Sequence, residues 1–279
     1  MPAPVVSSER QDSLDPAILG ESPSMRAIRA IIESIADIDA TVLIRGESGV
    51  GKDLVARNIH AHSSRRAGPF VKVNCAAIPH SLLESELFGH ERGAFNGAHR
   101  RKCGQLEYAK GGTLYLDEIA ELPPALQAKL LHVLQDFAFA RVGGDSLIEV
   151  DARVIAATNR DMERQVAVGE FREDLYDRLN VVELRIPPLR DRREEIPGLA
   201  ALFLDRFNRQ YGRQKQLAPE TLVRLTEHSW SDNVRELENA IRRMVLLDDD
   251  EPSRWPPRGP LRRWWSRVAL RGLTHPQLR

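Results

Sequence analysis

The chain has 279 residues, which is enough for one large domain or for a medium-sized domain with a small one. Its 40 basic side chains balance 40 acidic ones, so no net charge draws the whole chain to nucleic acid or to a membrane surface. Its two cysteines, Cys75 and Cys103, do not make a disulfide framework, and no Cys/His spacing indicates a zinc site.

The sequence carries no sign of export or of membrane insertion. The N-terminal segment lacks a basic start followed by an apolar stretch, so we expect no secretion signal. No run approaches the ~18 apolar residues that a membrane helix needs. We therefore expect a cytoplasmic protein without a membrane partner.

Residues 40–187 alternate short β-rich runs with segments of helical period. This alternation predicts an α/β fold in which crossover helices join the strands of a parallel sheet. The expected strands are near-continuous apolar runs, as in strands that are buried on both faces. They cover residues 41–45, 70–74, 113–117, 152–159 and 181–186. Helices are expected after the first strand, and over 123–135 on an apolar stripe of Leu126, Leu130, Val133 and Leu134.

A second, all-helical domain is expected after Pro187-Pro188, where the alternation stops. Helical period returns in residues 195–212, 218–230 and 233–247. We therefore divide the chain into a short tail, an α/β domain, a helical domain and a second tail. Their expected bounds are 1–16, 17–189, 190–249 and 250–279.

The final segment, 250–279, is rich in Arg, Pro and Trp and has no dependable period. One interpretation is a basic tail whose tryptophans stack on nucleic-acid bases. The other is a disordered end, which we favour because this mixture abruptly replaces a well-patterned helix. We recognise no helix-turn-helix after residue 249, so no DNA-binding domain supports DNA binding by this chain.

A phosphate loop is indicated by "GESGVGKD", residues 46–53. The usual pattern is Gly, four residues, Gly-Lys and then Ser or Thr, whose hydroxyl contacts magnesium, and here Asp53 stands in that last place. A chance match has a probability of roughly 2% on this composition. The loop also follows an expected strand and opens an expected helix, where N–H groups favour phosphate. The expected nucleotide-binding residues are Gly46, Glu47, Ser48, Gly49, Val50, Gly51, Lys52 and Asp53.

Two further strand ends carry polar residues. Asp117 and Glu118 follow the strand at 113–117, where Asp117 is expected to hold magnesium through water and Glu118 to activate the attacking water. Thr158 and Asn159 end the strand at 152–159, where a polar side chain can sense the γ-phosphate. Alone, each pair is also explained by a strand that ends in a surface turn; with the phosphate loop, the nucleotide interpretation is favoured.

Residues 18–247 resemble the central AAA+ ATPase domain of bacterial enhancer-binding proteins, which activate sigma-54 RNA polymerase. The most specific segment is "ELFGHERGAFNGAHRRKCGQLEYAKGGTLYLDEI", whose "GAFNGA" (93–98) is similar to the family's Gly-Ala-Phe-Thr-Gly-Ala loop. "FREDLYDRLNVVELRIPPLRDR" and "NVRELENAI" match in order and spacing. The resemblance implies a P-loop AAA+ sheet domain with a small helical lid, and ATP with magnesium as ligands. An acidic residue after Gly-Lys, such as Asp53, is within the family's pattern.

The resemblance also implies roles for single residues. Asn74 matches a residue thought to hold the catalytic Glu until the nucleotide state changes. Arg172 and Arg178 match arginine fingers that reach the neighbouring subunit of a hexameric ring, although local salt bridges are the alternative. Arg235 matches the lid-domain sensor of nucleotide, and a surface ion pair is its alternative.

The loop at 93–98 is implied to contact sigma-54. Its members are Gly93, Ala94, Phe95, Asn96, Gly97 and Ala98. Asn96 departs from the family's Thr and lacks its β-branch, so we expect weaker engagement of the polymerase. Ser231-Asp232 replaces Pro-Gly; we expect Asp232 to cap the next helix and the turn at Trp230 to be looser.

The leading hypothesis is therefore an ATPase that activates transcription by remodelling sigma-54 RNA polymerase. One alternative is a truncated regulatory module that binds nucleotide and partners but turns over poorly. Another is an AAA+ ATPase with a different client, against which the loop around Phe95 argues.

Overall fold

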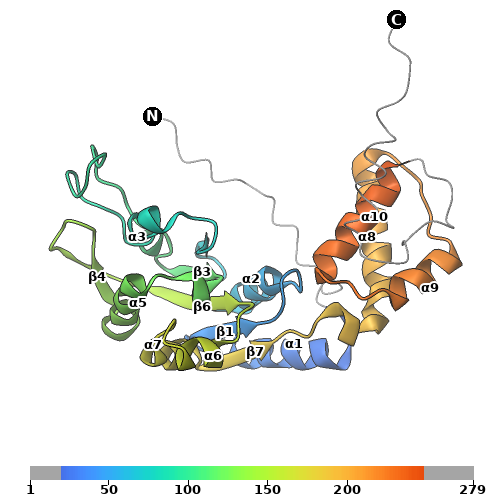
Figure 1. Cartoon of the computed structure of the whole chain (residues 1–279), viewed down its shortest axis with the longest axis horizontal. Helices are drawn as coiled ribbons and strands as arrows, with labels where there is room; N and C mark the ends of the chain where they lie inside the picture. Colours follow the sequence, from blue (N-terminus) through green and yellow to red (C-terminus); the bar gives the residue numbers. More distant parts are fainter. Residues whose placement is uncertain (1–19, 248–279) are drawn as a thin grey trace, which may run out of the picture. The chain divides into compact units, whose positions relative to one another are not determined.

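The structure is a computed structural model, which describes residues 20–247 (Figure 1). The chain divides into two compact units, one up to Pro188 and one from Leu189. The tails expected at 1–16 and 250–279 lie outside the described residues.

The first unit is built on a five-stranded parallel sheet with the order β2-β3-β6-β1-β7. The strands are β1 (Val42–Arg45), β2 (Phe70–Asn74), β3 (Gly112–Asp117), β6 (Ala152–Thr158) and β7 (Val182–Arg185). Four of the five runs predicted from the sequence contain one of these strands, and β3 begins one residue before the run predicted at 113–117. The predicted fold class is confirmed. Because the strands are parallel, their carboxyl ends meet at one edge, where ligands bind in open α/β sheets.

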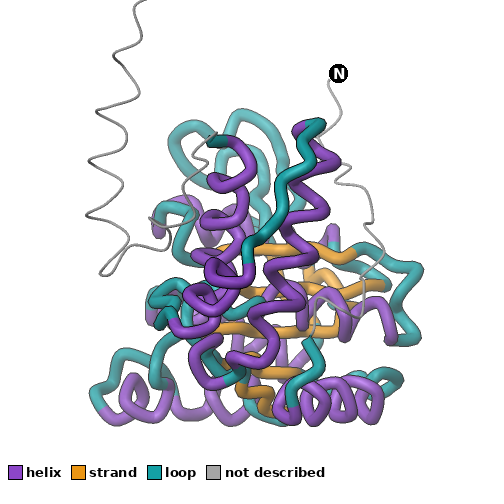
Figure 2. Tube along the Cα trace, turned by 90° about the vertical axis from the view of Figure 1, so that its right-hand side faces the viewer, coloured by secondary structure: helices purple, strands orange, loops and turns teal. Residues whose placement is uncertain are grey.

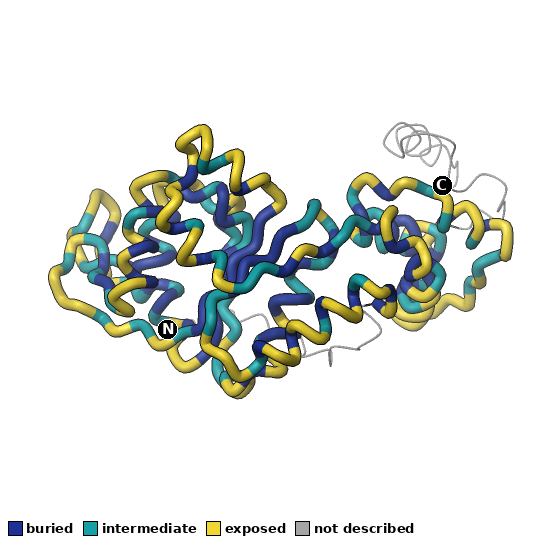
Figure 3. Tube along the Cα trace, turned by 90° about the horizontal axis from the view of Figure 1, so that it is seen from below, coloured by how far each residue is buried: buried dark blue, intermediate teal, exposed yellow. Residues whose placement is uncertain are grey.

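Helices cover both faces of this sheet, as Figure 2 shows. One face packs on α1 (Pro23–Ile35) and α2 (Lys52–His62) through strand residues such as Ile44 and Tyr115. The other face packs on a larger set through residues such as Leu43 and Leu116. That set is α3 (His80–Phe88), α4 (Gln105–Tyr108), α5 (Pro124–Asp136), α6 (Met162–Ala167) and α7 (Glu173–Leu179). The apolar stripe predicted for 123–135 is buried in α5, and the strands form the buried centre of the unit (Figure 3).

A small antiparallel hairpin stands apart from the main sheet. It consists of β4 (Ala138–Ala140) and β5 (Leu147–Glu149). Its connecting loop contacts the segment that contains Phe95, through a bridge between His90 and Val142.

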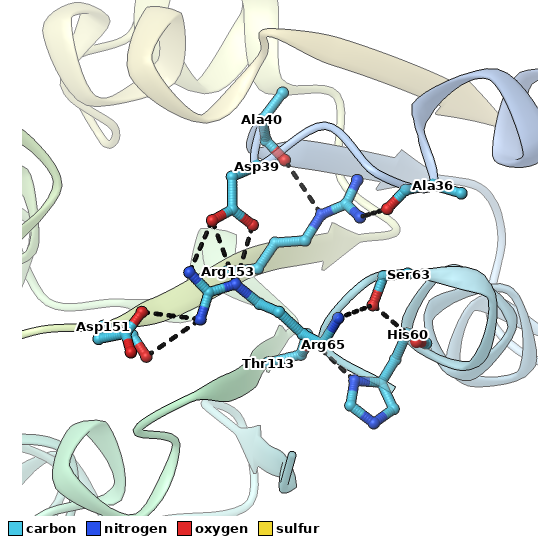
Figure 4. Close-up of polar contacts among 9 residues, drawn as sticks. All are labelled: Ala36, Asp39, Ala40, His60, Ser63, Arg65, Thr113, Asp151 and Arg153. Carbon is cyan, nitrogen blue, oxygen red and sulfur yellow. Dashed lines mark hydrogen bonds and ion pairs between the residues drawn. The ribbon is translucent and has the colours of Figure 1, made fainter. Parts of the chain in front are cut away.

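The amino-terminal edge of the sheet is held by two arginines (Figure 4). Arg153 of β6 is 3% exposed, and its guanidinium donates at 2.9 Å to the carbonyl of Ala36 and to a second carbonyl at the same end of α1. These are carbonyl groups that a helix cannot satisfy by itself. Arg65 beside it joins Asp39 to Asp151, with N–O distances of 2.6 and 2.8 Å. The cluster is therefore a clamp between α1 and the strands.

Replacing Arg153 with Met is expected to lower the free energy of unfolding of the first unit by roughly 2–4 kcal/mol, because buried carbonyl groups lose their donors. Amide hydrogen exchange in β6 measures this change. Arg101→Met is the matched control, since Arg101 is exposed and its acidic partner lies 3.9 Å away. Equal protection in the two variants would contradict the clamp.

Within residues 189–247, the second unit contains three α-helices around a buried tryptophan. They are α8 (Ile196–Tyr211), α9 (Pro219–Glu227) and α10 (Asn233–Leu246). Trp230 is fully buried, and its indole N–H donates to the Leu225 carbonyl at 2.8 Å. Phe207 and Leu237 pack in the same core. The all-helical character predicted for this part is confirmed. No helix within residues 20–247 has the length and apolar character to cross a bilayer.

One expectation about the start of α10 is wrong. Asp232 occupies the N-cap position but its side chain does not cap the helix; its carboxylate lies 3.2 Å from Arg235 Nη1. Glu236 reaches back instead and accepts the Asp232 N–H at 3.0 Å. At the preceding turn the Trp230 ring is buried and its indole N–H bonds to the Leu225 carbonyl. That this turn is looser than one with Pro-Gly stays a prediction.

Candidate nucleotide-binding site

The loop at residues 46–53 runs from the end of β1 into α2. Its glycines permit the path: Gly49 and Gly51 have φ of +77° and +106°, which side chains with a Cβ rarely adopt. Gly51 is the N-cap of α2 and supplies no side-chain cap. The first N–H groups of a helix have no acceptor within it, so this end of α2 is suited to bind an anion.

Lys52 is drawn into the loop, and its side chain is only 7% exposed. Its ammonium donates to the carbonyl groups of Gly46 and Glu47 at 3.0 and 3.3 Å. It also lies 3.5 Å from Glu118 Oε1. The lysine expected to contact phosphate is therefore in contact with the glutamate expected to activate water.

Asp117 and Glu118 end β3 at the same edge of the sheet. Asp117 accepts the hydroxyl of Tyr115 at 3.2 Å. Burial raises the pKa of Tyr115, so the hydroxyl stays protonated and donates. Glu118 has φ of +53° and ψ of +52°, a left-handed conformation that is unfavourable for a residue with a side chain. Such strain is concentrated at functional sites.

The expected residue on β6 meets this pair directly. The backbone N–H of Asn159 donates to Glu118 Oε2 at 3.2 Å, so the glutamate connects the ends of β3 and β6. Thr158 stabilises the turn by accepting the Arg160 N–H at 3.0 Å. The structure thus brings together Lys52, Glu118 and Asn159.

Asn74 lies beside the site but does not contact the glutamate. It pairs in register with Asp117 on the neighbouring strand. Its side-chain oxygen accepts the N–H groups of Ala76 and Ala77 at 3.0 and 3.1 Å. Between these described residues no hydrogen bond joins Asn74 to Glu118, so the side chain here closes its own turn.

Asp53 is held by two cations. Its Oδ1 lies 2.9 Å from Lys72 Nζ, and its Oδ2 accepts Arg57 Nε at 3.0 Å. Burial alone would raise the pKa of Asp53, but Lys72 and Arg57 hold it below its ordinary value. The Lys72 ammonium is also 3.6 Å from Asp117 Oδ2.

Sequence reasoning missed Lys72. A usable signal is its spacing from Asn74, because alternate residues of a strand share a face. Lys72 therefore shares a face of β2 with a residue already assigned to the site.

The two arginines expected to act on a neighbouring subunit flank α7. Arg172 is the N-cap residue of this helix, and its exposed guanidinium pairs with Asp174 at 2.6 Å. Arg178 donates twice to the Leu134 carbonyl near the end of α5, at 3.0 and 2.7 Å. Arg172 is therefore held by a surface ion pair, whereas Arg178 makes structural bonds within its own unit.

A buried glutamine, which the sequence analysis did not single out, fixes the backbone of Arg172. Gln127 of α5 accepts the Arg172 N–H at 2.9 Å. Its amide group donates to the carbonyls of Leu122 and Glu170 at 2.8 and 3.0 Å. The signal in the sequence is a polar residue, Gln127, next to the apolar stripe predicted for this helix.

The loop at 93–98 projects its aromatic side chain. Phe95 is 42% exposed and touches the ring of His90 edge-on, with 4.9 Å between centroids. Gly93 and Gly97 have φ of +84° and +107°, and the Gly93 N–H donates to the Ala98 carbonyl at 2.8 Å. The loop is thus a closed turn with an exposed tip.

The base of this loop is fixed by Arg141 of the hairpin, whose guanidinium pairs with Glu91 at 2.8 Å and with Glu107 at 2.5 Å. These pairs raise the pKa of Arg141 further above its ordinary value and keep it charged. The two loops therefore share one rigid base.

Arg235, the expected lid sensor, lies in the first turn of α10 in the second unit. Its guanidinium is 58% exposed and is 3.2 Å from Asp232. A surface ion pair is therefore present, as considered from the sequence, although its partner is Asp232 and not a glutamate.

The donor set of the first unit suits a nucleoside triphosphate with magnesium. Lys52 and the start of α2 are cationic and donor-rich, as phosphates require. The described residues contain no group of three or more His, Cys, Asp or Glu that could hold a metal by themselves. Magnesium at phosphate sites commonly uses one or two carboxylates together with phosphate and water, which Asp117 with Asp53 nearby can provide.

Comparison with known proteins agrees with this geometry. Residues 18–185 match the family described as the Sigma-54 interaction domain, and residues 190–253 match the AAA+ ATPase lid domain. The Nif-specific regulatory protein of Azotobacter vinelandii is 51% identical over 233 residues, which are 84% of this chain and 45% of that protein. The same regulator of Sinorhizobium fredii is 54% identical over 230 residues, which are 82% of this chain and 39% of that protein.

Among solved structures, NtrX from Brucella abortus in complex with ADP superposes with a TM-score of 0.78 at 44% identity, covering 87% of this chain and 54% of that one. NtrX from the same organism in complex with ATP superposes with a TM-score of 0.77, also at 44% identity, and the match covers 84% of this chain and 51% of that one. The chain spans less than half the length of these Nif-specific regulatory proteins and just over half of the NtrX chains.

Proposed function

Because the chain belongs to the sigma-54 interaction domain family of AAA+ ATPases, we propose that it hydrolyses ATP and uses this energy to remodel sigma-54 RNA polymerase closed complexes in the cytoplasm. The observation that carries the proposal is the composition of the first unit. It combines Lys52, Asp117 and Glu118 at one edge of the sheet with the exposed loop of Phe95.

The residues of the site have separable tasks. The loop at 46–53, with Lys52, binds the phosphates of ATP through N–H groups and one ammonium. Asp117 holds magnesium through water, and the ion neutralises charge on the phosphates when bound. Glu118 takes a proton from the attacking water, and Asn159 orients that water beside the γ-phosphate.

The contact between Lys52 and Glu118 links binding to catalysis. Phosphate oxygens compete for the Lys52 ammonium, which now lies 3.5 Å from Glu118. When Lys52 turns to phosphate, Glu118 keeps the Asn159 N–H as its partner and becomes available to accept a proton. In the state in which Glu118 is held inactive, Asn74 restrains it. To do so, the Asn74 side chain first releases the N–H groups of Ala76 and Ala77.

Hydrolysis depends on assembly in this proposal. Arg172 and Arg178 reach the phosphates bound by a neighbouring subunit of a hexameric ring, where a cation stabilises the charge that develops during phosphoryl transfer. Arg235 of the second unit contacts the nucleotide and reports its state. The exposure of Arg172 supports this assignment most directly, because it leaves the side chain accessible to another subunit.

The loop at 93–98 is the proposed contact with sigma-54. Phe95 offers apolar area at an exposed tip, and the glycines on either side permit a change of backbone conformation. The shared base joins the loop to the hairpin and to α4, so movement of these elements can reach the tip.

Replacing Phe95 with Ala is expected to weaken sigma-54 binding at least about tenfold, because an exposed aromatic side chain supplies most of the contact area of the tip. Asn96→Thr is expected to strengthen binding and activation, because the β-branched side chain is stiffer. Capture of purified sigma-54 in the presence of a transition-state analogue of ATP hydrolysis measures binding by both variants, and a reconstituted sigma-54 transcription assay measures activation.

Tyr108→Ala is the control for these loop variants, since Tyr108 is 52% exposed and lies outside the loop. The loop has no role in binding if Phe95→Ala captures sigma-54 as well as Tyr108→Ala does. Unchanged activation by Asn96→Thr would show that Asn96 does not weaken activation.

A further inference from the structure

The ammonium of Lys72 is shared between the two carboxylates nearest to the expected metal position. It lies 2.9 Å from Asp53 Oδ1 and 3.6 Å from Asp117 Oδ2. These carboxylates come from different elements, since Asp53 is in the first turn of α2 and Asp117 ends β3. One protein cation therefore bridges the oxygens that a metal ion would use.

The position of Lys72 is set by the sheet. It pairs in register with Tyr115 on β3, and its ammonium lies 5.6 Å from the centroid of that ring. Tyr115 in turn donates its hydroxyl to the other oxygen of Asp117. The side chain is 36% exposed, so it can leave the carboxylates without unfolding its strand.

Each carboxylate of the site already has a cationic partner in the structure. Asp53 has Lys72 and Arg57, Asp117 has Lys72, and Glu118 has Lys52. A divalent cation that reaches Asp53 and Asp117 alone therefore competes with Lys72 and adds positive charge to a neutralised cluster. The same cation arriving with the phosphates of a nucleotide brings its own compensating negative charge.

We propose that Lys72 excludes free divalent cations from the Asp53–Asp117 pair, so that magnesium enters this site only together with nucleotide phosphates. This inference rests on the proposed nucleotide site and assigns a metal-gating task to a residue outside the phosphate loop and the strand-end carboxylates. The physical cause is competition between one ammonium and one divalent ion for the same two oxygens.

The test measures binding of Mn²⁺ alone, by electron paramagnetic resonance of the free ion, without nucleotide. Lys72→Met removes the ammonium and keeps the length of the side chain, and it is expected to raise Mn²⁺ affinity by about tenfold or more. Lys72→Arg keeps the charge and is expected to show no gain. Lys129→Met is the matched control, because Lys129 pairs with Glu84 on another part of the same unit.

A second variant locates the bound ion. In Lys72→Met with Asp117→Asn, the gain in Mn²⁺ affinity is expected to disappear. The proposal is overturned if Lys72→Met shows no gain, or if the gain persists in the double variant. Lys72→Gln serves the same purpose should the Met variant not fold, as judged by circular dichroism.

Addition of ADP separates this inference from the proposed function. If the nucleotide site is correct, ADP raises the Mn²⁺ affinity of the unmodified chain. The difference in Mn²⁺ affinity between the unmodified chain and Lys72→Met then becomes smaller. Absence of any effect of ADP counts against the proposed function, whereas absence of a gain with Mn²⁺ alone counts only against the task of Lys72.

Discussion

Replacing Glu118 with Gln is expected to lower ATP turnover by about 10²- to 10⁴-fold, because an amide cannot take the proton of the attacking water. The substitution keeps an oxygen that can accept the Asn159 N–H, so the geometry of the strand ends is preserved. It removes the negative charge 3.5 Å from Lys52, so ATP binding is expected to stay the same or to tighten. Steady-state turnover, with binding of a fluorescent ATP analogue, measures both quantities.

The control for this change is Glu121→Gln. Glu121 is three residues further along, and its carboxylate pairs with Arg160 and not with Lys52. Turnover by Glu118→Gln that equals turnover by Glu121→Gln would remove Glu118 from catalysis. Loss of ATP binding by Glu118→Gln would indicate that Glu118 is needed for the structure of the nucleotide site and not only for catalysis.

Replacing Arg172 with Ala is expected to lower turnover by about 10³-fold, because a cation supplied by the neighbouring subunit stabilises the charge that develops on the phosphates. The side chain is exposed and, among the described residues, its guanidinium pairs with Asp174 on the surface, so its removal is expected to leave folding intact. Arg178 is a less direct probe, because its two bonds to the Leu134 carbonyl also stabilise α5.

Mixed assemblies make this test sharper. Lys52→Ala lacks a phosphate-binding lysine, and Arg172→Ala lacks the finger, so each is expected to be inactive alone. When the two proteins are mixed, a subunit with Lys52 can receive Arg172 from its neighbour, and turnover is expected to return in part. Arg185→Ala is the surface control, since this residue is 67% exposed and pairs with Glu183. A mixture that stays as inactive as its components would contradict action between subunits.

The strands of the sheet were well predicted from the sequence, because strands that are buried on both faces consist almost entirely of apolar residues. Residues 42–44 and 154–157 are apolar throughout, and the structure buries all of them. The helix at 124–136 was equally clear from its stripe. The order of the strands was not predictable from such runs, because burial does not say which strand lies next to which.

Other features depend on contacts between distant parts of the chain. The amphipathic helix α1 was not predicted, and its buried face became clear only from its packing on the sheet. The bridge from Lys72 to Asp53 and Asp117 joins three elements whose adjacency the sequence does not state. Asp232 was misjudged for a local reason, because its carboxylate pairs with the Arg235 guanidinium and accepts no N–H group of the first turn of α10.

We propose that this chain turns over ATP at sites completed by neighbouring subunits. Magnesium-dependent ATP turnover per subunit, measured as protein concentration rises, tests this proposal most directly. We expect turnover that climbs with concentration and reaches a plateau as the ring fills. Nucleotide binding with turnover at background at every concentration would contradict it, and would identify the chain as a nucleotide-binding module without catalysis of its own.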